Sequence, residues 1–246
     1  MAASSAIAWT DSTWNPVRGC TEVSPGCAHC YAKAFAERFR GVAGHPFEQG
    51  FDLRLVPESL SLPLKWRQPR LIFVNSMSDL YHEDVPLEYI QRVFEVMGQA
   101  RQHTFQILTK RHERLAELAP HLPWSPNIWQ GVSVENNRWA VRADALRTVP
   151  AAVRFLSCEP LLGPLDKLDL RDVDWVIGGG ESGPRHRPFK IEWARDLRDR
   201  TKAADLPFFW KQNGGIHAKA GGNELDGRVW QEWPDSTGVV LSRAGA

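Results

Sequence analysis

Six short apolar runs recur along this 246-residue chain, and their spacing constrains the fold more than any other feature. The runs are rich in β-branched and aromatic residues and begin 21 to 34 positions apart. They are RLIFVN (70–75), TFQILT (104–109), NIWQGVSV (127–134), VRFLSC (153–158), DWVIGG (174–179) and PFFWKQ (207–212). Continuous apolar runs of this length are typical of strands buried on both faces, as in parallel sheets.

Patterns with a helical period separate most of these runs, over residues 86–101, 112–119, 137–149 and 190–205. Strands that alternate with helices predict an α/β fold around a parallel sheet. The pattern alone leaves a doubly wound open sheet and a (β/α) barrel as alternatives. We also expect an earlier strand around 14–19, a helix at 31–40 and a further short strand near 51–56.

The composition has no break, repeat or low-complexity linker, so we expect a single domain over 1–246, with 216–246 as a Gly-rich hairpin or loose extension. The net charge of +1 gives no sign of a basic nucleic-acid-binding domain, although a local basic patch is compatible with it. The N-terminal residues lack the pattern of a signal peptide, and no apolar run approaches the roughly 20 residues that span a bilayer. We therefore expect a cytoplasmic protein with reduced thiols and no membrane partner.

Cys20, Cys27 and Cys30 lie within eleven positions, and Cys158 is the only other cysteine. Clustered cysteines in a reducing compartment more often bind metal or do chemistry than form disulfides. A structural zinc ion would need a fourth ligand, for which His29 and Cys158 are the nearest candidates. A [4Fe–4S] cluster held by three thiolates would leave one iron open to a small molecule. Both kinds of site stay open at this point.

The segment WNPVRGCTEVSPGCAHCYA (14–32) resembles the three-cysteine loop of the radical S-adenosylmethionine (SAM) superfamily. It is more closely similar to a phage and bacterial family known by this three-cysteine motif, which is distantly related to spore photoproduct lyase. The spacing here is C-x6-C-x2-C, whereas the superfamily commonly has C-x3-C-x2-C. The resemblance extends from about residue 8 to residue 215.

This resemblance implies a partial parallel (β/α) barrel of about six strands. It further implies an enzyme in which Cys20, Cys27 and Cys30 hold a [4Fe–4S] cluster and SAM binds the open iron. An external electron donor would drive reductive cleavage of SAM to a 5′-deoxyadenosyl radical, which abstracts hydrogen from a substrate. The alternative from another functional class is a zinc-stabilised nucleic-acid-binding module without catalysis.

Polar residues follow the predicted strands, and parallel α/β folds place their sites at the carboxyl ends of strands. Where the superfamily usually has a Gly-Gly-Glu motif for the SAM amino group, this chain offers hydroxyl and carboxylate acceptors instead. Glu135 and Asn136 suit a ribose diol, and the glycine turn 178–180 would let the backbone approach a ligand. The expected SAM contacts are Ser76, Ser78, Asp79, Ser133, Glu135, Asn136 and Glu181.

Basic residues follow three of the same strands, and Arg and Lys are the usual partners of phosphate. They predict either an anion-binding rim for a phosphate-bearing substrate, nucleic acid or nucleotide, or a solvated surface. The residues are Lys110, Arg111, Arg185, Arg187 and Lys211.

Single residues near the strand ends have two interpretations each. Cys158 is either a small core hydrophobe or, facing the barrel mouth, a hydrogen-atom donor such as the cysteine of spore photoproduct lyase. Aromatic residues could stack a nucleobase or belong to the core. These are Trp14, Tyr31, Trp129 and Trp139.

Overall fold

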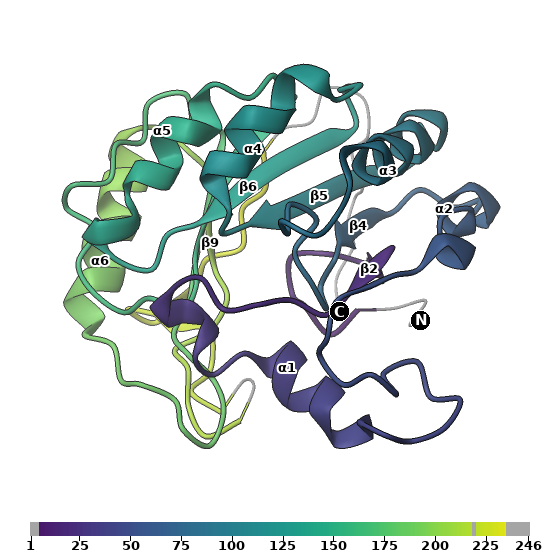
Figure 1. The fold of residues 1–246 in the computed structure, drawn as a ribbon. Helices are drawn as coiled ribbons and strands as arrows, with labels where there is room; N and C mark the ends of the chain where they lie inside the picture. Colours follow the sequence, from purple (N-terminus) through teal and green to yellow (C-terminus); the bar gives the residue numbers. More distant parts are fainter. Residues whose placement is uncertain (1–4, 218–219, 235–246) are drawn as a thin grey trace.

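The computed structural model describes residues 5–217 and 220–234, and its centre is a sheet of seven parallel strands (Figure 1). The strands are β1 (Ser12–Trp14), β4 (Leu71–Val74), β5 (Thr104–Thr109), β6 (Ile128–Ser133), β7 (Val153–Cys158), β8 (Trp175–Gly178) and β9 (Phe208–Trp210). They lie side by side in chain order, and every neighbouring pair is parallel. The sheet curves into a half-barrel, which confirms the predicted partial (β/α) barrel, with one strand more than the six apolar runs.

The strand expected around 14–19 is divided in two in the structure. Its first part is β1, which begins at Ser12 and joins the sheet beside β4. Its second part is β2 (Val17–Arg18), which pairs antiparallel with β3 (Arg54–Leu55) in the predicted 51–56 region. Pro16 stands between the two parts, and it has no N–H with which to continue a ladder.

Helices follow the strands where the patterns predict them. The α-helices are α1 (Tyr31–Ala36), α2 (Leu62–Lys65), α3 (Leu87–Gln99), α4 (His112–Leu118), α5 (Val141–Arg147) and α6 (Ile191–Ala203). Short 3₁₀ turns are η1 (Pro25–Cys27), η2 (Glu37–Phe39), η3 (Pro57–Ser59), η4 (Ala119–His121) and η5 (Asn137–Trp139). Figure 1 shows α3 to α6 along the outside of the curved sheet. The segment with the three clustered cysteines, residues 20–30 and called the cysteine segment below, lies with α1 across the lower end of the sheet. No described helix is long and apolar enough to cross a membrane.

The sheet has two apolar faces, because successive side chains of a strand point to opposite sides. Ile72 and Val74 of β4 pack in the large cluster that includes the helices. Leu71 and Phe73 of the same strand pack in a second cluster on the other face, which Trp9 covers. Burial on both faces is why the strands read as continuous apolar runs in the sequence.

The Gly-rich C-terminal region contains the expected hairpin, β10 (Glu224–Leu225) with β11 (Arg228–Val229). The residues after it run along the free edge of β9, where the Trp210 N–H donates to the carbonyl of Trp230 and the Glu232 N–H donates to that of Phe208. Residues 218–219 and 235–246 of the predicted extension lie outside the described residues.

Candidate metal and cofactor site

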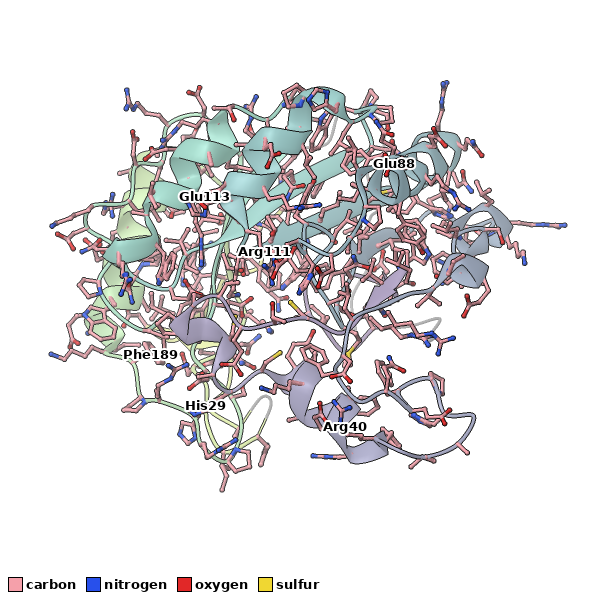
Figure 2. All side chains as sticks on the ribbon, in the orientation of Figure 1. His29, Arg40, Glu88, Arg111, Glu113 and Phe189 are labelled. Carbon is pink, nitrogen blue, oxygen red and sulfur yellow. The ribbon has the colours of Figure 1, made fainter. Side chains whose placement is uncertain are left out.

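A cavity of about 170 Å³ lies where the cysteine segment crosses the carboxyl ends of β4, β5 and β6. In Figure 2, His29 marks the cysteine segment and Arg111 marks the chain just after β5. The lining contains all three clustered cysteines and five of the other predicted site residues. These residues are Cys20, Cys27, Cys30, Ser76, Ser78, Asp79, Lys110 and Ser133.

Two polar side chains that line this cavity have an atom without a hydrogen-bond partner among the described residues. They are the Asn75 amide nitrogen Nδ2 and the Ser133 hydroxyl Oγ, and both residues are buried. A buried polar atom without a partner costs about 1–3 kcal/mol. Two residues of the lining therefore have unused hydrogen-bonding capacity, on atoms that are themselves buried. The three cysteines in the same lining supply the thiol donors that a thiolate-held cluster needs.

The conformation of Asn75 explains how the chain turns into the cavity after β4. Asn75 has a φ of 62°, in the left-handed region that asparagine tolerates better than most residues. Its Oδ1 accepts a hydrogen bond from the Val17 N–H at 3.3 Å, which holds the amide in place. In the sequence, Asn75 is the last residue of the apolar run 70–75, and this place at the end of a predicted strand was the available signal.

The predicted SAM acceptors after β4 already have partners within the protein. Both carboxylate oxygens of Asp79 accept hydrogen bonds from the Thr109 hydroxyl, at 2.8 and 2.9 Å, and the Lys110 N–H donates to one of them at 3.2 Å. The hydroxyl of Ser76 donates to the Asn15 side chain, and that of Ser78 donates to the Val17 carbonyl. These contacts join the loop after β4 to β5 and to the start of the cysteine segment.

Glu135 and Asn136, expected at the ribose, do not line the cavity. Glu135 is fully buried, where its carboxylate accepts a hydrogen bond from the Ser24 hydroxyl at 2.5 Å and forms an ion pair with Arg142 at 2.8 Å. Asn136 instead caps η5, since its Oδ1 accepts the Arg138 N–H at 3.0 Å. Glu135 thus fixes the cysteine segment to the end of β6, and its ribose role stays a prediction that this geometry does not support.

Glu181, just beyond β8, makes a second tie to the cysteine segment. Its carboxylate accepts hydrogen bonds from Arg187 and, at 3.0 Å, lies against His29 Nδ1. Arg187 Nη2 also donates to the Pro25 carbonyl at 2.9 Å. Burial alone would raise the pKa of Glu181, but the hydrogen bonds from Arg187 and His29 outweigh it and lower the pKa to about 2. The carboxylate is therefore ionised at neutral pH.

The glycine turn 178–180 does not leave space for a ligand. A Cβ on Gly179 would lie 2.5 Å from Glu159 Oε1, and one on Gly180 would lie 2.6 Å from the Asn213 carbonyl oxygen. The close approach predicted for a ligand is made by the protein's own chain.

Most of the predicted basic rim is paired with acidic residues. Arg111 pairs with Glu83 and Arg187 with Glu181. Lys211 lies 3.3 Å from Glu159. Of the other two, Lys110 lines the cavity and Arg185 is exposed. The five residues therefore do not form one uncompensated anion site.

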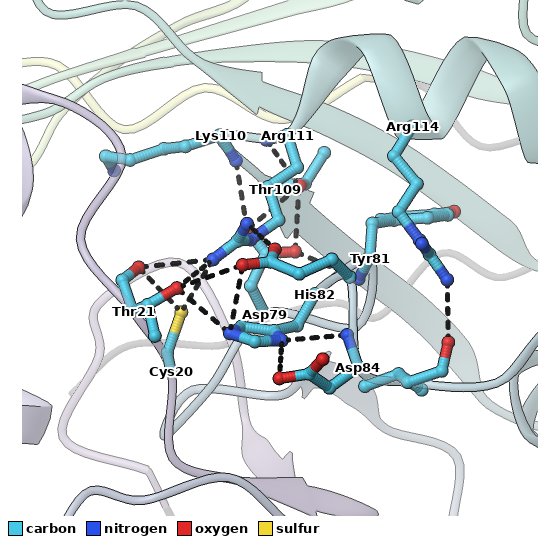
Figure 3. A network of polar contacts seen from close by, with 12 residues as sticks. Cys20, Thr21, Asp79, Tyr81, His82, Asp84, Thr109, Lys110, Arg111 and Arg114 are labelled. Carbon is cyan, nitrogen blue, oxygen red and sulfur yellow. Dashed lines mark hydrogen bonds and ion pairs between the residues drawn. The ribbon is translucent and has the colours of Figure 1, made fainter.

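Figure 3 shows the polar network around Cys20 and Arg111. Arg111 Nη2 donates to the Thr21 hydroxyl at 2.8 Å and lies 4.0 Å from Cys20 Sγ. Burial and the nearby charge of Asp79 raise the pKa of the Cys20 thiol to about 12, while Arg111 acts in the opposite direction. Thr21, His82 and Glu83 were missed at the sequence level, since contacts across 61 and 62 positions leave no local signal.

Cys158 does not face the cavity. Its side chain is fully buried in the large cluster on the helix side of the sheet, and burial raises its pKa. Of the two interpretations of Cys158, this position favours the core hydrophobe over the hydrogen-atom donor at the barrel mouth. Of the two candidates for a fourth zinc ligand, Cys158 lies in the core, and His29 contacts Glu181 through Nδ1. In the described ranges, no group of three or more His, Cys, Asp or Glu side chains is arranged to hold a metal ion directly.

Residues 4–234 match the model of a family described as "Protein of unknown function (DUF5131)". The chain belongs to this family. No curated protein matches it. Among solved structures, it is similar to spore photoproduct lyase complexed with dinucleoside spore photoproduct, with a TM-score of 0.50 and 13% identity. The match covers 81% of this chain and 74% of that one, and at this identity it shows the fold, the half-barrel.

The four aromatic residues singled out for base stacking separate into two groups. Trp14 and Trp129 are buried, one on each face of the sheet, and Trp139 is partly buried with the Arg142 guanidinium 4.0 Å above its ring. Tyr31 lines the cavity, and its hydroxyl donates to the Ser76 carbonyl at 2.7 Å. In this DUF5131 chain, Tyr31 is the one of the four that could meet a ligand there.

Proposed function

We propose that this protein is a radical SAM enzyme in which Cys20, Cys27 and Cys30 hold a [4Fe–4S] cluster and SAM occupies the adjoining cavity. The observation that carries the proposal is that the three cysteines line one cavity together with Asn75 and Ser133, two residues that each have a buried polar atom without a partner among the described residues. The similarity of the half-barrel to that of spore photoproduct lyase supports it.

When bound, the cluster would supply the electron that cleaves SAM to a radical able to abstract hydrogen from a substrate. The chain's own residues would bind and orient the cofactor. The Asn75 amide can donate a hydrogen bond and the Ser133 hydroxyl can donate or accept one, so both suit the polar groups of SAM. The Glu135 and Glu181 contacts would hold the cysteine segment, and with it two of the three thiolates, against the strand ends.

For the substrate, we propose a nucleic acid or a nucleotide. The similar lyase is complexed with a dinucleoside, and Lys110 at the cavity and Arg185 on the surface can meet phosphate. Neither residue forms an ion pair with any described residue. The electron would come from a separate cytoplasmic donor.

The first test is anaerobic reconstitution with iron and sulfide, followed by metal analysis and an absorption spectrum. We expect about four irons per chain, as a [4Fe–4S] cluster requires. Cys27→Ala should lose them, and the matched control Cys158→Ala, which removes a thiol outside the cavity, should keep them. Stoichiometric zinc without iron, or equal iron in the two variants, would contradict the proposal.

The second test concerns the substrate of the reconstituted, SAM-loaded protein. Oligonucleotide affinity should fall with salt in proportion to the phosphates neutralised, and Lys110→Gln with Arg185→Gln should flatten that slope. Arg171→Gln, a surface change on the loop between β7 and β8, is the control. Binding of neither oligonucleotides nor nucleotides at low salt would exclude this substrate class.

A further inference from the structure

Arg111 approaches Cys20 from outside the cavity. It is not among the residues that line the cavity, although its neighbours Thr109 and Lys110 are. Its N–H donates to the Thr109 hydroxyl at 2.9 Å, which fixes the backbone just after β5. From there the side chain reaches back to the first cysteine.

Two residues hold the guanidinium in this place. Thr21, next to Cys20 in the chain, accepts hydrogen bonds from Nη2 with its hydroxyl at 2.8 Å and with its carbonyl at 3.2 Å. Glu83 forms an ion pair with Nη1. The Arg111 side chain is only 9% exposed, so its position is set by these contacts.

The guanidinium contacts Cys20 and also has unused hydrogen-bonding capacity. Nη2 lies 4.0 Å from Cys20 Sγ, and the Nε–H is buried without a partner in the part of the chain that the structure describes. A buried donor without a partner is costly, and an anionic acceptor beside it would remove that cost.

We infer that Arg111 is a positioning residue of the proposed cluster, which holds Cys20 from behind and raises the reduction potential through its charge. The inference rests on the proposed function. A cation near a cluster stabilises the reduced form, which carries one more negative charge, and second-shell contacts to ligating groups are a known means of tuning a metal centre. Glu83 would oppose this effect, because its carboxylate offsets part of the guanidinium charge.

Replacing Arg111 and replacing Glu83 should therefore shift the reduction potential in opposite directions. Arg111→Gln should lower the ratio of reduced to oxidised cluster at a fixed potential about tenfold, which for a one-electron couple corresponds to about 59 mV. Glu83→Gln should raise that ratio, since it leaves the guanidinium charge uncompensated. Arg111→Lys, which keeps the charge, should stay between Arg111→Gln and the wild type.

The experiment is a redox titration of the reconstituted proteins, followed by the spectrum of the reduced cluster, with iron content and thermal stability measured on the same samples. Arg114→Gln is the matched control, because it removes the same charge three residues further along the chain, in α4. The Arg114 side chain donates to the Val85 carbonyl and not to the cysteine segment. Its potential should match the wild type.

If Arg111 had a purely structural role, its replacement would lower the iron content or the thermal stability, and Arg111→Gln and Glu83→Gln would not shift the reduction potential in opposite directions. Shifts of the same sign in Arg111→Gln and Glu83→Gln, or no shift in either, would overturn the inference while leaving the proposed function intact. A wild-type protein that takes up no iron would instead overturn the proposed function. If Arg111→Gln fails to assemble a cluster, Glu83→Gln and Arg111→Lys still decide the sign.

Discussion

The ion pair between Glu135 and Arg142 provides a sharp test of how the cysteine segment is held. Both side chains are fully buried, and Arg142 Nη1 is shared between the Glu135 carboxylate at 2.8 Å and the Ser133 carbonyl at 2.7 Å. The Arg142 atoms Nε and Nη2 have no hydrogen-bond partner among the described residues. The change Glu135→Gln keeps the size of the side chain but removes the charge that compensates this guanidinium.

Breaking a buried ion pair by removing one partner costs about 3–5 kcal/mol, because the other charge stays buried. Glutamine retains a carbonyl that can accept one hydrogen bond, so we expect the lower end, about 3 kcal/mol. For a chain of this size, 1 kcal/mol shifts the melting temperature by about 2–4 °C, which gives a decrease of about 6–12 °C.

The assay is urea unfolding of the wild type and Glu135→Gln, with the slope of free energy against urea compared between them. The double variant with Arg142→Met should be less destabilised than Glu135→Gln, because the uncompensated charge is gone. The control is Asp144→Asn in α5, the helix that also carries Arg142. Asp144 pairs with Arg147 and is 68% exposed, so its replacement should leave the unfolding midpoint unchanged. A loss below about 1 kcal/mol in Glu135→Gln would refute the reasoning, since it would mean that the pair is not desolvated.

Four further outcomes follow from contacts described above. The pKa of Glu181, about 2, lies below its unfolded value of about 4.3, so this carboxylate stabilises the fold above about pH 5 and loses that effect as the pH falls towards 2. The difference in melting temperature between wild type and Glu181→Gln should therefore shrink over that window, and a constant difference would contradict the assignment. Gly26→Ala places a Cβ 2.4 Å from Glu135 Oε1, so iron uptake should fall while the circular dichroism spectrum stays unchanged. Full iron uptake would contradict the role of Glu135 in holding the cysteine segment. Gly98→Ala, in α3 with its nearest neighbour 3.7 Å away, should raise the free energy of unfolding by about 0.5–1 kcal/mol, as read from urea midpoints. Ser133→Ala should weaken SAM binding in calorimetry with little loss of stability, because its hydroxyl has no partner to lose, and unchanged affinity would move the SAM contact elsewhere.

The sheet was predictable because its strands are buried on both faces. The run VRFLSC at 153–158 matches β7 residue for residue, and TFQILT at 104–109 matches β5. The earliest strand was the least accurate, since β1 has only three residues and Pro16 interrupts the region. Curvature into a half-barrel was expected from the resemblance, because the alternation of elements is the same in an open sheet.

The site was predictable to the level of loops but not of partners. The carboxyl ends of β4, β5 and β6 meet at one edge, so Ser76, Asp79 and Ser133 do reach the cavity with the cysteines. The Glu135 carboxylate bonds to Ser24, which lies 111 positions away in the chain, and a local sequence pattern cannot predict such a contact. Cys158 was open to two interpretations because a strand's last residue can point to either face, and here the alternation along β7 directs it to the helices.

The order of the strands bears on how the protein is made. From β4 to β9, each strand pairs with a neighbour whose first partner lies only 20 to 33 positions along the chain, whereas Ser12 of β1 pairs with Ile72, 60 positions later. At about 5–20 residues per second, the ribosome would need roughly 3–12 s to deliver that partner. The three cysteines lie between these two partners, in the segment 15–71. On a nascent chain the three thiols would thus be made several seconds before β4, the strand whose end they cover in the folded protein.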